Sequence, residues 1–403
     1  MTGRNDPNPR AGAGIQAPPP PLDPSVMLRQ ADALAGDLRE RTGPFDERVR
    51  ALLPARWAAV DTVSIVGDGD SYHAACAVRM AFASLAGVDC RPVNALRFVE
   101  YDHPGDHPVD RPVGRPGAEG RPPRHELTLA VSASGRTPLV VRSAERAREG
   151  GAHAIAVTGT PDSPLARAAD DTLLVTLPDT ERSPGVRTYQ ASVLGLLLIA
   201  IRLGTLRGRL TGQEADALRG ELSALAGPVE ATVAAARSRC PEIAERIADA
   251  AVLSVLGSGP SHGTALFAAA KVIETSGVFA TGQDLEEWCH VERFARPPGT
   301  PVIVVAAPGR TYGHAAEVAA RAAALGRRVI TVAPEDDSAI TRQGWAALPV
   351  TGRVREEFSP LLYHVFAAPL SCHLAQLLGR APFLADLPRP TPTTTPRHRG
   401  ETP

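Results

Sequence analysis

The chain of 403 residues contains almost no lysine: of its 43 basic residues, only Lys271 is a lysine. Arginine stays protonated at physiological pH, so it can serve neither as a base nor as an imine-forming amine. The one position that keeps a lysine is therefore a candidate for a specific chemical role.

Cysteines and long apolar runs are also scarce. The five cysteines are scattered and form no C-x-x-C pair, which fits a reducing cytosol and argues against a disulfide scaffold or a zinc cage. The longest apolar run, near 193–201, falls well short of the ~20 residues that a membrane span needs. The N-terminus lacks the apolar stretch of a secretory signal, and a net charge of −1 gives no sign of nucleic-acid binding. We expect a cytoplasmic protein with no nucleic-acid or membrane partner, no metal and no cofactor.

The chain does contain a hexapeptide that recurs, with changes, in its second half. Residues 132–137 read S-A-S-G-R-T and follow an apolar strand at 127–131, just before a helix that begins at Pro138. Residues 306–311 lie 174 positions further along the chain. They read A-A-P-G-R-T and follow the strand 301–305. Free N–H groups and the dipole at a helix start favour an anion. The first copy therefore predicts a phosphate cradle, and the second copy has lost its hydroxyls.

A second motif repeats in the same order. The strand 62–66 runs into a G-D-G-D-S turn at 67–71, and the strand 252–256 runs into a G-S-G-P-S turn at 257–261. Strands alternate with helices in both halves of the chain. The pattern predicts an α/β protein with two parallel sheets.

This pattern divides the chain into six predicted segments. They are a disordered N-terminal tail (1–23), two short N-terminal helices (24–58), a first α/β domain (59–208), a helical connector (209–250), a second α/β domain (251–386) and a disordered C-terminal tail (387–403). The first domain includes a Pro/Gly-rich insertion at 102–125. In the connector, Thr211 and Glu214 predict a capping box, and Pro228 and Pro241 are expected to restart helices.

On these residues the chain resembles the tandem sugar isomerase (SIS) domain family, and most of all the isomerase half of glutamine–fructose-6-phosphate aminotransferase. The family's S-x-S-G-x-T phosphate loop is matched by Ser132, Ser134, Gly135 and Thr137, and its G-T-S-Y turn is matched by residues 69–72. The resemblance covers about 25–388 and implies two tandem SIS-type domains, each a parallel sheet flanked by helices.

The resemblance implies that these two loops hold the 6-phosphate of a hexose. The residues expected to do so are Ser71, Ser132, Ser134, Gly135, Arg136 and Thr137.

The resemblance also implies acid–base residues in the second half. The family's K-x-x-E helix segment matches Lys271 and Glu274, and its histidine, 16 residues beyond the glutamate, matches His290. In relatives the glutamate moves a proton between C1 and C2 of the sugar, and the histidine assists ring opening from a partner subunit, so a homodimer is expected. Lys271 would supply supporting charge. Ketose–aldose exchange does need a base, a proton shuttle and positive charge near a developing enediolate.

Some features depart from the family pattern. The aminating relatives have an N-terminal cysteine nucleophile, whereas the first cysteine here is Cys76, and they end in an imine-forming lysine that is missing after Pro388. His290 is followed by V-E instead of G-P. Amination is therefore not expected. Isomerisation, deaminating isomerisation and deglycation of a hexose or amino-hexose 6-phosphate remain, and the alternative is a non-catalytic sugar-phosphate sensor.

Each candidate also has a plainer interpretation. The 132–137 segment could be an ordinary helix cap, Lys271 and Glu274 an i,i+3 ion pair, and His290 a core or interface histidine. Asp70 is unexpected in a phosphate turn because its charge repels the ligand, and we expect Arg136 to compensate.

Two further patterns are weak. Aspartates and histidines alternate in 102–110 like metal ligands, but a solvated Pro-rich loop explains them better. The G-x-G at 67–69 suggests a dinucleotide site, yet Tyr72 stands at the third glycine of that fingerprint.

Overall fold

The structure, a computed structural model, describes residues 21–102 and 126–383. The predicted disordered tails and the predicted Pro/Gly-rich insertion lie outside these ranges, apart from a few residues at their edges.

Within the described residues the chain forms two sheets of five parallel strands each. The first sheet has the order β2 (Asp89–Asn94), β1 (Thr62–Gly67), β3 (Glu126–Val131), β4 (His153–Thr158) and β5 (Asp171–Leu174). The second has the order β7 (Phe279–Gln283), β6 (Val252–Leu256), β8 (Pro301–Val305), β9 (Arg328–Pro334) and β10 (Ala346–Val350). The two sheets share one topology, and the predicted α/β fold with two parallel sheets is confirmed.

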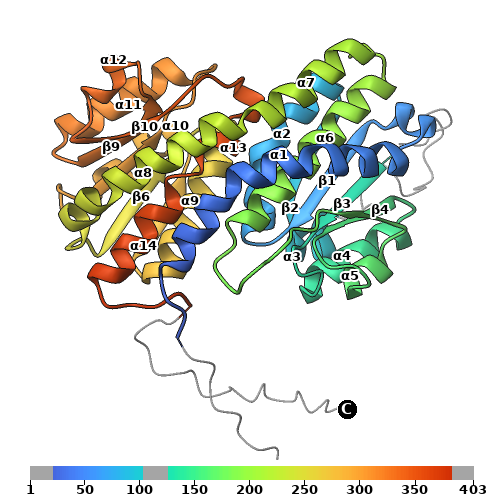
Figure 1. Cartoon of the computed structure of the whole chain (residues 1–403), viewed down its shortest axis with the longest axis horizontal. Helices are drawn as coiled ribbons and strands as arrows, with labels where there is room; N and C mark the ends of the chain where they lie inside the picture. Colours follow the sequence, from blue (N-terminus) through green and yellow to red (C-terminus); the bar gives the residue numbers. More distant parts are fainter. Residues whose placement is uncertain (1–20, 103–125, 384–403) are drawn as a thin grey trace, which may run out of the picture.

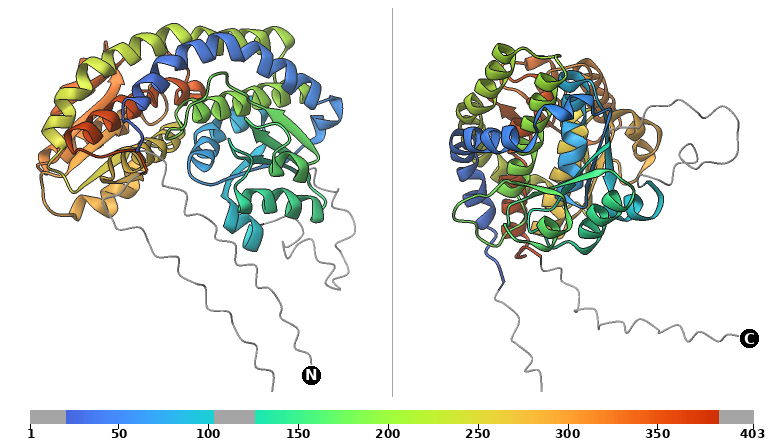
Figure 2. Two further views of the ribbon diagram at one scale, coloured as in Figure 1. Left: turned by 60° about the horizontal axis from the view of Figure 1, so that its bottom comes forward. Right: turned by 90° about the vertical axis from the view of Figure 1, so that its right-hand side faces the viewer.

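Helices flank both sheets (Figure 1). Around the first sheet they are α2 (Asp70–Ala81), α3 (Ala95–Arg97), α4 (Pro138–Glu149), α5 (Pro164–Ala168) and α6 (Arg187–Leu206). Around the second they are α9 (Pro260–Ser276), α10 (Leu285–His290), α11 (Tyr312–Ala324), α12 (Ser338–Thr341), α13 (Pro360–Tyr363) and α14 (Ala367–Leu377). The long helices α1 (Val26–Leu52) and α8 (Ala226–Ile247) lie along one side of both sheets, and α7 (Gly212–Ala224) precedes α8 (Figures 1 and 2).

The N-terminal region differs from the prediction of two short helices. A single helix, α1, runs for 27 residues and contains Pro44, and a short 3-10 helix, Ala55–Ala59, follows it. The apolar face continues across the proline, since Leu38 and Phe45 are both fully buried. Burial of this continuous face outweighs the local cost of a proline inside the helix.

The connector follows its sequence signals in part. Thr211 and Glu214 form the predicted capping box: the Thr211 Oγ1 accepts from the Glu214 N–H at 3.2 Å, and the Glu214 carboxylate accepts from the Thr211 N–H at 2.8 Å. Pro228 lies in the first turn of α8, where a missing N–H costs nothing. Pro241, however, lies inside α8 and does not begin a helix, so that prediction is wrong.

Helices α2 and α9 bring the two halves of the chain into contact. Gly263 of α9 faces Ala77 of α2 so closely that a Cβ on Gly263 would lie 2.6 Å from the Ala77 Cα. Phe267, one turn further on, stacks on Tyr189 of α6 with ring centroids 3.9 Å apart. The packing embeds α9 against the first half, and it directs Lys271, one turn beyond Phe267, toward that half.

One helix among the described residues, α6, is long and apolar enough to cross a membrane by length and composition. In the folded protein, 83% of its most apolar window is buried. Burial to this extent is typical of a core helix of a globular protein.

Candidate functional site

The predicted phosphate loop connects β3 to α4 and is built around a glycine that no other residue can replace. Gly135 has φ +62°, and the hydroxyl of Ser163 lies where a Cβ would be placed. Ser132 is buried, with its Oγ 3.1 Å from the Thr137 Oγ1. Thr137 is the N-cap residue of α4, but its side chain makes no capping hydrogen bond. Its hydroxyl therefore faces Ser132 across the loop.

Ser134 and Arg136 occupy the exposed side of the same loop. The Arg136 N–H donates to the Ser134 Oγ at 3.3 Å. Among residues 21–102 and 126–383, the Arg136 guanidinium has no hydrogen bond or ion pair, so it is available to an anion. The loop thus presents hydroxyls, backbone N–H groups and one positive charge at the start of a helix.

The glycine turn lies beside this loop because β1 and β3 are neighbouring parallel strands. Gly69 has φ +53°, and a Cβ on Gly67 would lie 2.6 Å from the Ser71 Cβ. The strand order also changes direction between β1 and β3. In open α/β sheets, ligands bind at the carboxyl edge at such a switch point, so Ser71 and residues 132–137 occupy the expected position for a ligand.

Lys271 joins the second half to this turn. Its side chain is fully buried, and its Nζ donates to the Asp70 Oδ2 at 2.7 Å and to the Glu274 Oε2 at 2.5 Å. Asp70 precedes Ser71, so the ion pair links the candidate acid–base residues directly to the candidate phosphate turn. The structure thus brings Lys271 and Glu274 to Asp70, the residue next to Ser71 in the chain.

The same contacts correct our interpretation of Asp70. We expected Arg136 to offset its charge, but the carboxylate is paired with Lys271 instead. One signal in the sequence could have led to this pairing: a lysine in a helix with few other charged residues requires a counter-ion once it is buried.

The three charges shift one another's pKa values. Burial alone would raise the pKa of Asp70, but the Lys271 ammonium and His73 hold it below its usual value. Burial would lower the pKa of Lys271, and the two carboxylates raise it instead. Burial raises the pKa of Glu274, with a contribution from the Asp70 charge, and Lys271 only partly opposes this. Glu274 is therefore the carboxylate of the pair that can accept a proton closer to neutral pH.

The start of α6 completes this side of the site. A Cβ on Gly185 would lie 2.7 Å from the Asp70 Oδ2 and 2.8 Å from the Thr188 Oγ1, so this segment lies directly against Asp70. Arg187 fixes it by donating two hydrogen bonds of 2.7 Å to the Asp37 carboxylate of α1. This buried pair was not found from the sequence, since the two residues are 150 positions apart.

His290 lies apart from these residues. It is the last residue of α10, its side chain is 68% exposed, and its Nε2 is 2.9 Å from the Glu286 Oε1. The other carboxylate oxygen of Glu286 is 2.8 Å from the Nε2 of His314. Within the part of the chain that the structure describes, His290 makes no contact with Lys271 or Glu274. A role for His290 at the site of the same chain therefore has no support, and its role from a partner subunit stays a prediction.

No group of three or more His, Cys, Asp or Glu side chains in the described ranges is arranged to hold a metal ion. The candidate metal pattern at 102–110 lies outside these ranges except for Asp102, whose carboxylate pairs with Arg97.

Comparison with known proteins agrees with this fold. The SIS domain profile matches residues 124–202, which include the whole phosphate loop. The C-terminal domain of glucosamine-fructose-6-phosphate aminotransferase from Francisella tularensis has a similar structure, with a TM-score of 0.70 and 17% identity over 87% of this chain and 97% of that one. Glucosamine-6-phosphate deaminase from Thermotoga maritima has a TM-score of 0.63 and 20% identity over 88% and 96%. A SIS domain profile thus matches part of the first half, and the fold of the chain is that of two SIS-type domains in tandem.

More particularly, the chain is similar to the isomerase half of glutamine–fructose-6-phosphate aminotransferases. It is 27% identical over 328 residues to that protein from Halobacterium salinarum, an alignment that covers 80% of this chain and 50% of the relative. The chain thus spans about half the length of the curated relatives it matches.

Proposed function

We propose that the chain binds the phosphate of a hexose or amino-hexose 6-phosphate at Ser71 and residues 132–137, and that it carries out enediol chemistry at C1 and C2. The observation that carries this proposal is the Lys271–Asp70 ion pair of 2.7 Å, because it fixes Glu274 beside the turn that holds Ser71.

In the proposed reaction, Glu274 takes the proton from the carbon next to the sugar carbonyl. The electron pair of that C–H bond moves toward the carbonyl oxygen to form an enediolate. The hydroxyl proton of the neighbouring oxygen passes to the former carbonyl oxygen, the carbonyl re-forms on the carbon that lost its proton, and Glu274 returns that proton to the former carbonyl carbon. Lys271 holds the carboxylate of Glu274 in place and supplies positive charge near the developing enediolate. Only protons move, so the reaction calls for no redox cofactor.

This step is common to isomerisation, deaminating isomerisation and deglycation. Amination through an imine has less support, because Lys271 is the only lysine of the chain and is fully buried. Its two carboxylate partners raise its pKa and so keep it protonated, which makes it a poor nucleophile.

The names of the similar proteins support the sugar-phosphate class. The curated relatives are named for fructose 6-phosphate, and one structural neighbour is titled a glucosamine-6-phosphate deaminase. We also propose a homodimer, a cytoplasmic location and the domain boundaries predicted from the sequence.

The proposal is tested by hydrogen exchange. The protein is incubated with hexose and hexosamine 6-phosphates in D₂O, and NMR follows deuterium at C1 and C2. We expect exchange with at least one substrate, and we expect Glu274→Gln to lower its rate by roughly 10²–10⁴-fold while the sugar phosphate still binds, as for loss of a general base. Binding of these sugars by the wild type with no exchange would contradict the enzymatic proposal.

A non-catalytic sugar-phosphate sensor is the second candidate. The observation that favours it is the position of His290, which is exposed and followed by V-E rather than the family's G-P. The same experiment separates the two, since a sensor binds the sugar phosphate without exchanging its protons.

A further inference from the structure

The second half of the chain contains a counterpart of the phosphate loop, and the carboxylate of Glu356 is hydrogen-bonded to it. Residues 306–311 connect β8 to α11, just as residues 132–137 connect β3 to α4. Glu356, in the short 3-10 helix Glu356–Phe358, reaches this loop from 46 residues further along the chain, and its Oε2 accepts a hydrogen bond of 3.1 Å from the Arg310 N–H.

The carboxylate fits closely against the loop. A Cβ on Gly309 would overlap the carboxyl carbon of Glu356, so only glycine admits the acidic side chain here. The other carboxylate oxygen lies 3.9 Å from the position that a Cβ on Gly259 would take. Gly259 belongs to the second glycine turn and has φ +58°, close to the +53° of Gly69. Glu356 therefore lies between loop and turn, where the first half is proposed to hold a phosphate.

The loop suits an anion but has few groups of its own to hold one. Ala306 and Pro308 stand where the first loop has Ser132 and Ser134, so two hydroxyls are missing. The backbone N–H of Arg310 and the start of the 13-residue helix α11 remain, and both favour negative charge. The carboxylate of Glu356 supplies that charge from within the chain.

Open space adjoins this carboxylate. A cavity of about 580 Å³ is lined by Glu356 and Arg310 from the second half and by Tyr72 and Arg79 from the first. Neither the Arg79 nor the Arg310 guanidinium has a hydrogen bond or ion pair within residues 21–102 and 126–383. An anion that replaced the carboxylate would thus have room and two positive charges. The Asp284 carboxylate also lines the cavity, and it accepts a hydrogen bond of 2.6 Å from the Ser258 hydroxyl.

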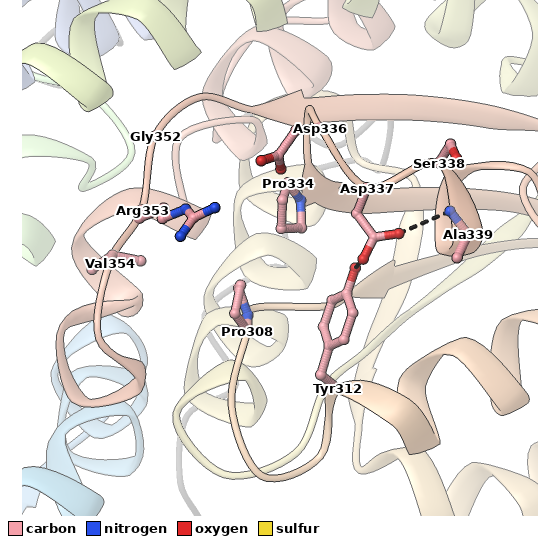
Figure 3. Close-up of a pocket in the computed structure, with 10 residues that line it drawn as sticks. All are labelled: Pro308, Tyr312, Pro334, Asp336, Asp337, Ser338, Ala339, Gly352, Arg353 and Val354. Atoms are coloured by element: carbon pink, nitrogen blue, oxygen red, sulfur yellow. Dashed lines mark hydrogen bonds between the residues drawn. The ribbon is translucent and has the colours of Figure 1, made fainter.

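A separate cavity of about 550 Å³ lies on the other side of the loop, between Pro308 and the ends of β9 and β10 (Figure 3). There the Tyr312 hydroxyl donates to the Asp337 carboxylate at 2.6 Å, and Asp337 accepts from the Ala339 N–H (Figure 3). Because Asp337 is already engaged in these bonds and repels anions, we place the latent anion site on the Glu356 side of the loop.

We propose that Glu356 is a resident anion that closes the second loop to phosphate. Two similar halves would offer two phosphate sites, but with Glu356 in place the chain binds only one phosphate ester. Removal of the carboxylate opens the second site, which Arg310, Arg79 and the start of α11 then provide. This inference concerns a different site from the proposed function and does not depend on it.

The test is the number of phosphate sites per chain. Wild type, Glu356→Ala and the control Glu357→Ala are titrated with inorganic phosphate and with glucose 6-phosphate, and bound ligand is counted by equilibrium dialysis and ³¹P NMR. Glu357 is a matched control because it is the neighbouring acid and its carboxylate accepts instead from Ser84, at 3.0 Å. We expect Glu356→Ala to bind one more phosphate per chain than the wild type and the control.

The outcomes separate the two proposals. A change from zero sites in the wild type to one in Glu356→Ala supports the resident anion and contradicts the proposed first site, whereas a change from one to two supports both. An equal number of sites in all three proteins overturns the inference. If Glu356→Ala does not fold, as judged by circular dichroism, Glu356→Gln removes the charge and keeps the shape, and the same count applies.

Discussion

At the scale of single residues, the central feature is a buried ammonium shared by two carboxylates with opposite pKa shifts. The pKa of Asp70 is lowered and that of Glu274 is raised, although both contact the same Lys271 Nζ. The Asp70 charge contributes to the raised pKa of Glu274. Two neighbouring acids with separated pKa values are typical of sites that transfer protons.

The pH dependence of proton exchange follows from this arrangement. If Glu274 is the base, the exchange rate rises with pH as Glu274 loses its proton, at a pH above the 4.5 of an ordinary glutamate. Asp70→Asn removes a negative charge that favours the protonated form of Glu274, so we expect the acid limb of the profile to move to lower pH. The rate of deuterium incorporation between about pH 4 and 8 measures this shift.

Glu230→Gln is a suitable control because this exposed glutamate pairs with Arg39 on the surface. An acid limb that stays in place in Asp70→Asn while the protein remains folded would show that Asp70 does not tune Glu274.

The sequence indicated Lys271, Glu274 and the 132–137 loop as candidates, and the structure pairs Lys271 with both Glu274 and Asp70. It did not indicate Asp37 or Glu356 because their partners lie 150 and 46 residues away, at Arg187 and Arg310. The spacing of residues in the sequence indicates which side chains are neighbours on one helix or at the end of one strand. It holds no information about which distant carboxylate reaches a given cation.

At the scale of elements, the strands that lead into the repeated turns and loops, β1, β3, β6 and β8, were predictable, but β7 and β10 of the second sheet were not. The strand β7 contains Thr, Gly and Gln, and β10 reads A-A-L-P-V. Neither segment has the β-branched and aromatic run that marks a strand, and both owe their conformation to pairing with β6 and β9. In the same way, tertiary packing overrides the helix-breaking effect of Pro44 in α1 and of Pro241 in α8.

The contact between α2 and α9 can be tested with one substitution. In Gly263→Val the added side chain collides with the backbone of Ala77, so we expect a loss of roughly 1–3 kcal/mol in the free energy of unfolding. The separation of the helices should also weaken the Lys271–Asp70 pair and so reduce proton exchange. Urea unfolding and the deuterium assay measure the two effects.

Gly220→Ala serves as the matched control. Gly220 lies in the exposed interior of α7 with no atom within 4 Å of a new Cβ, and alanine there should stabilise the protein by about 0.5–1 kcal/mol. A folded Gly263→Val protein with wild-type stability and exchange would contradict the importance of this close approach.

At the scale of the whole molecule, the two sheets share one strand order but differ in their loops. The first half has the hydroxyl-bearing loop, the second half contributes Lys271 and Glu274, and the second loop is filled by Glu356. The sequence predicted this division between the halves, since 306–311 lacks the two serine hydroxyls of the first loop. It could not predict what replaces the ligand there, because that depends on how the chain folds back.

The proposed homodimer makes a prediction about mixed subunits. If His290 acts on the partner's site, Glu274→Gln and His290→Gln are each inactive alone, yet a mixed dimer contains one intact site. Statistical exchange of subunits should then restore about a quarter of the wild-type activity. The assay is deuterium exchange after the two variants are unfolded and refolded together.

Refolding each variant separately and then mixing them without exchange is the control. Recovery of no activity in the co-refolded sample, with dimers shown by light scattering, would mean that His290 acts within its own chain or not at all.

The burial of the only lysine protects its amine from amine-directed reagents. In the folded protein such a reagent does not reach Lys271, whose side chain is fully buried between the two halves. Acylation of Lys271 therefore requires α9 to move away from the glycine turn of the first half. An acyl group on Lys271, located by mass spectrometry, then reports how often the two halves separate, and no engineered residue is needed.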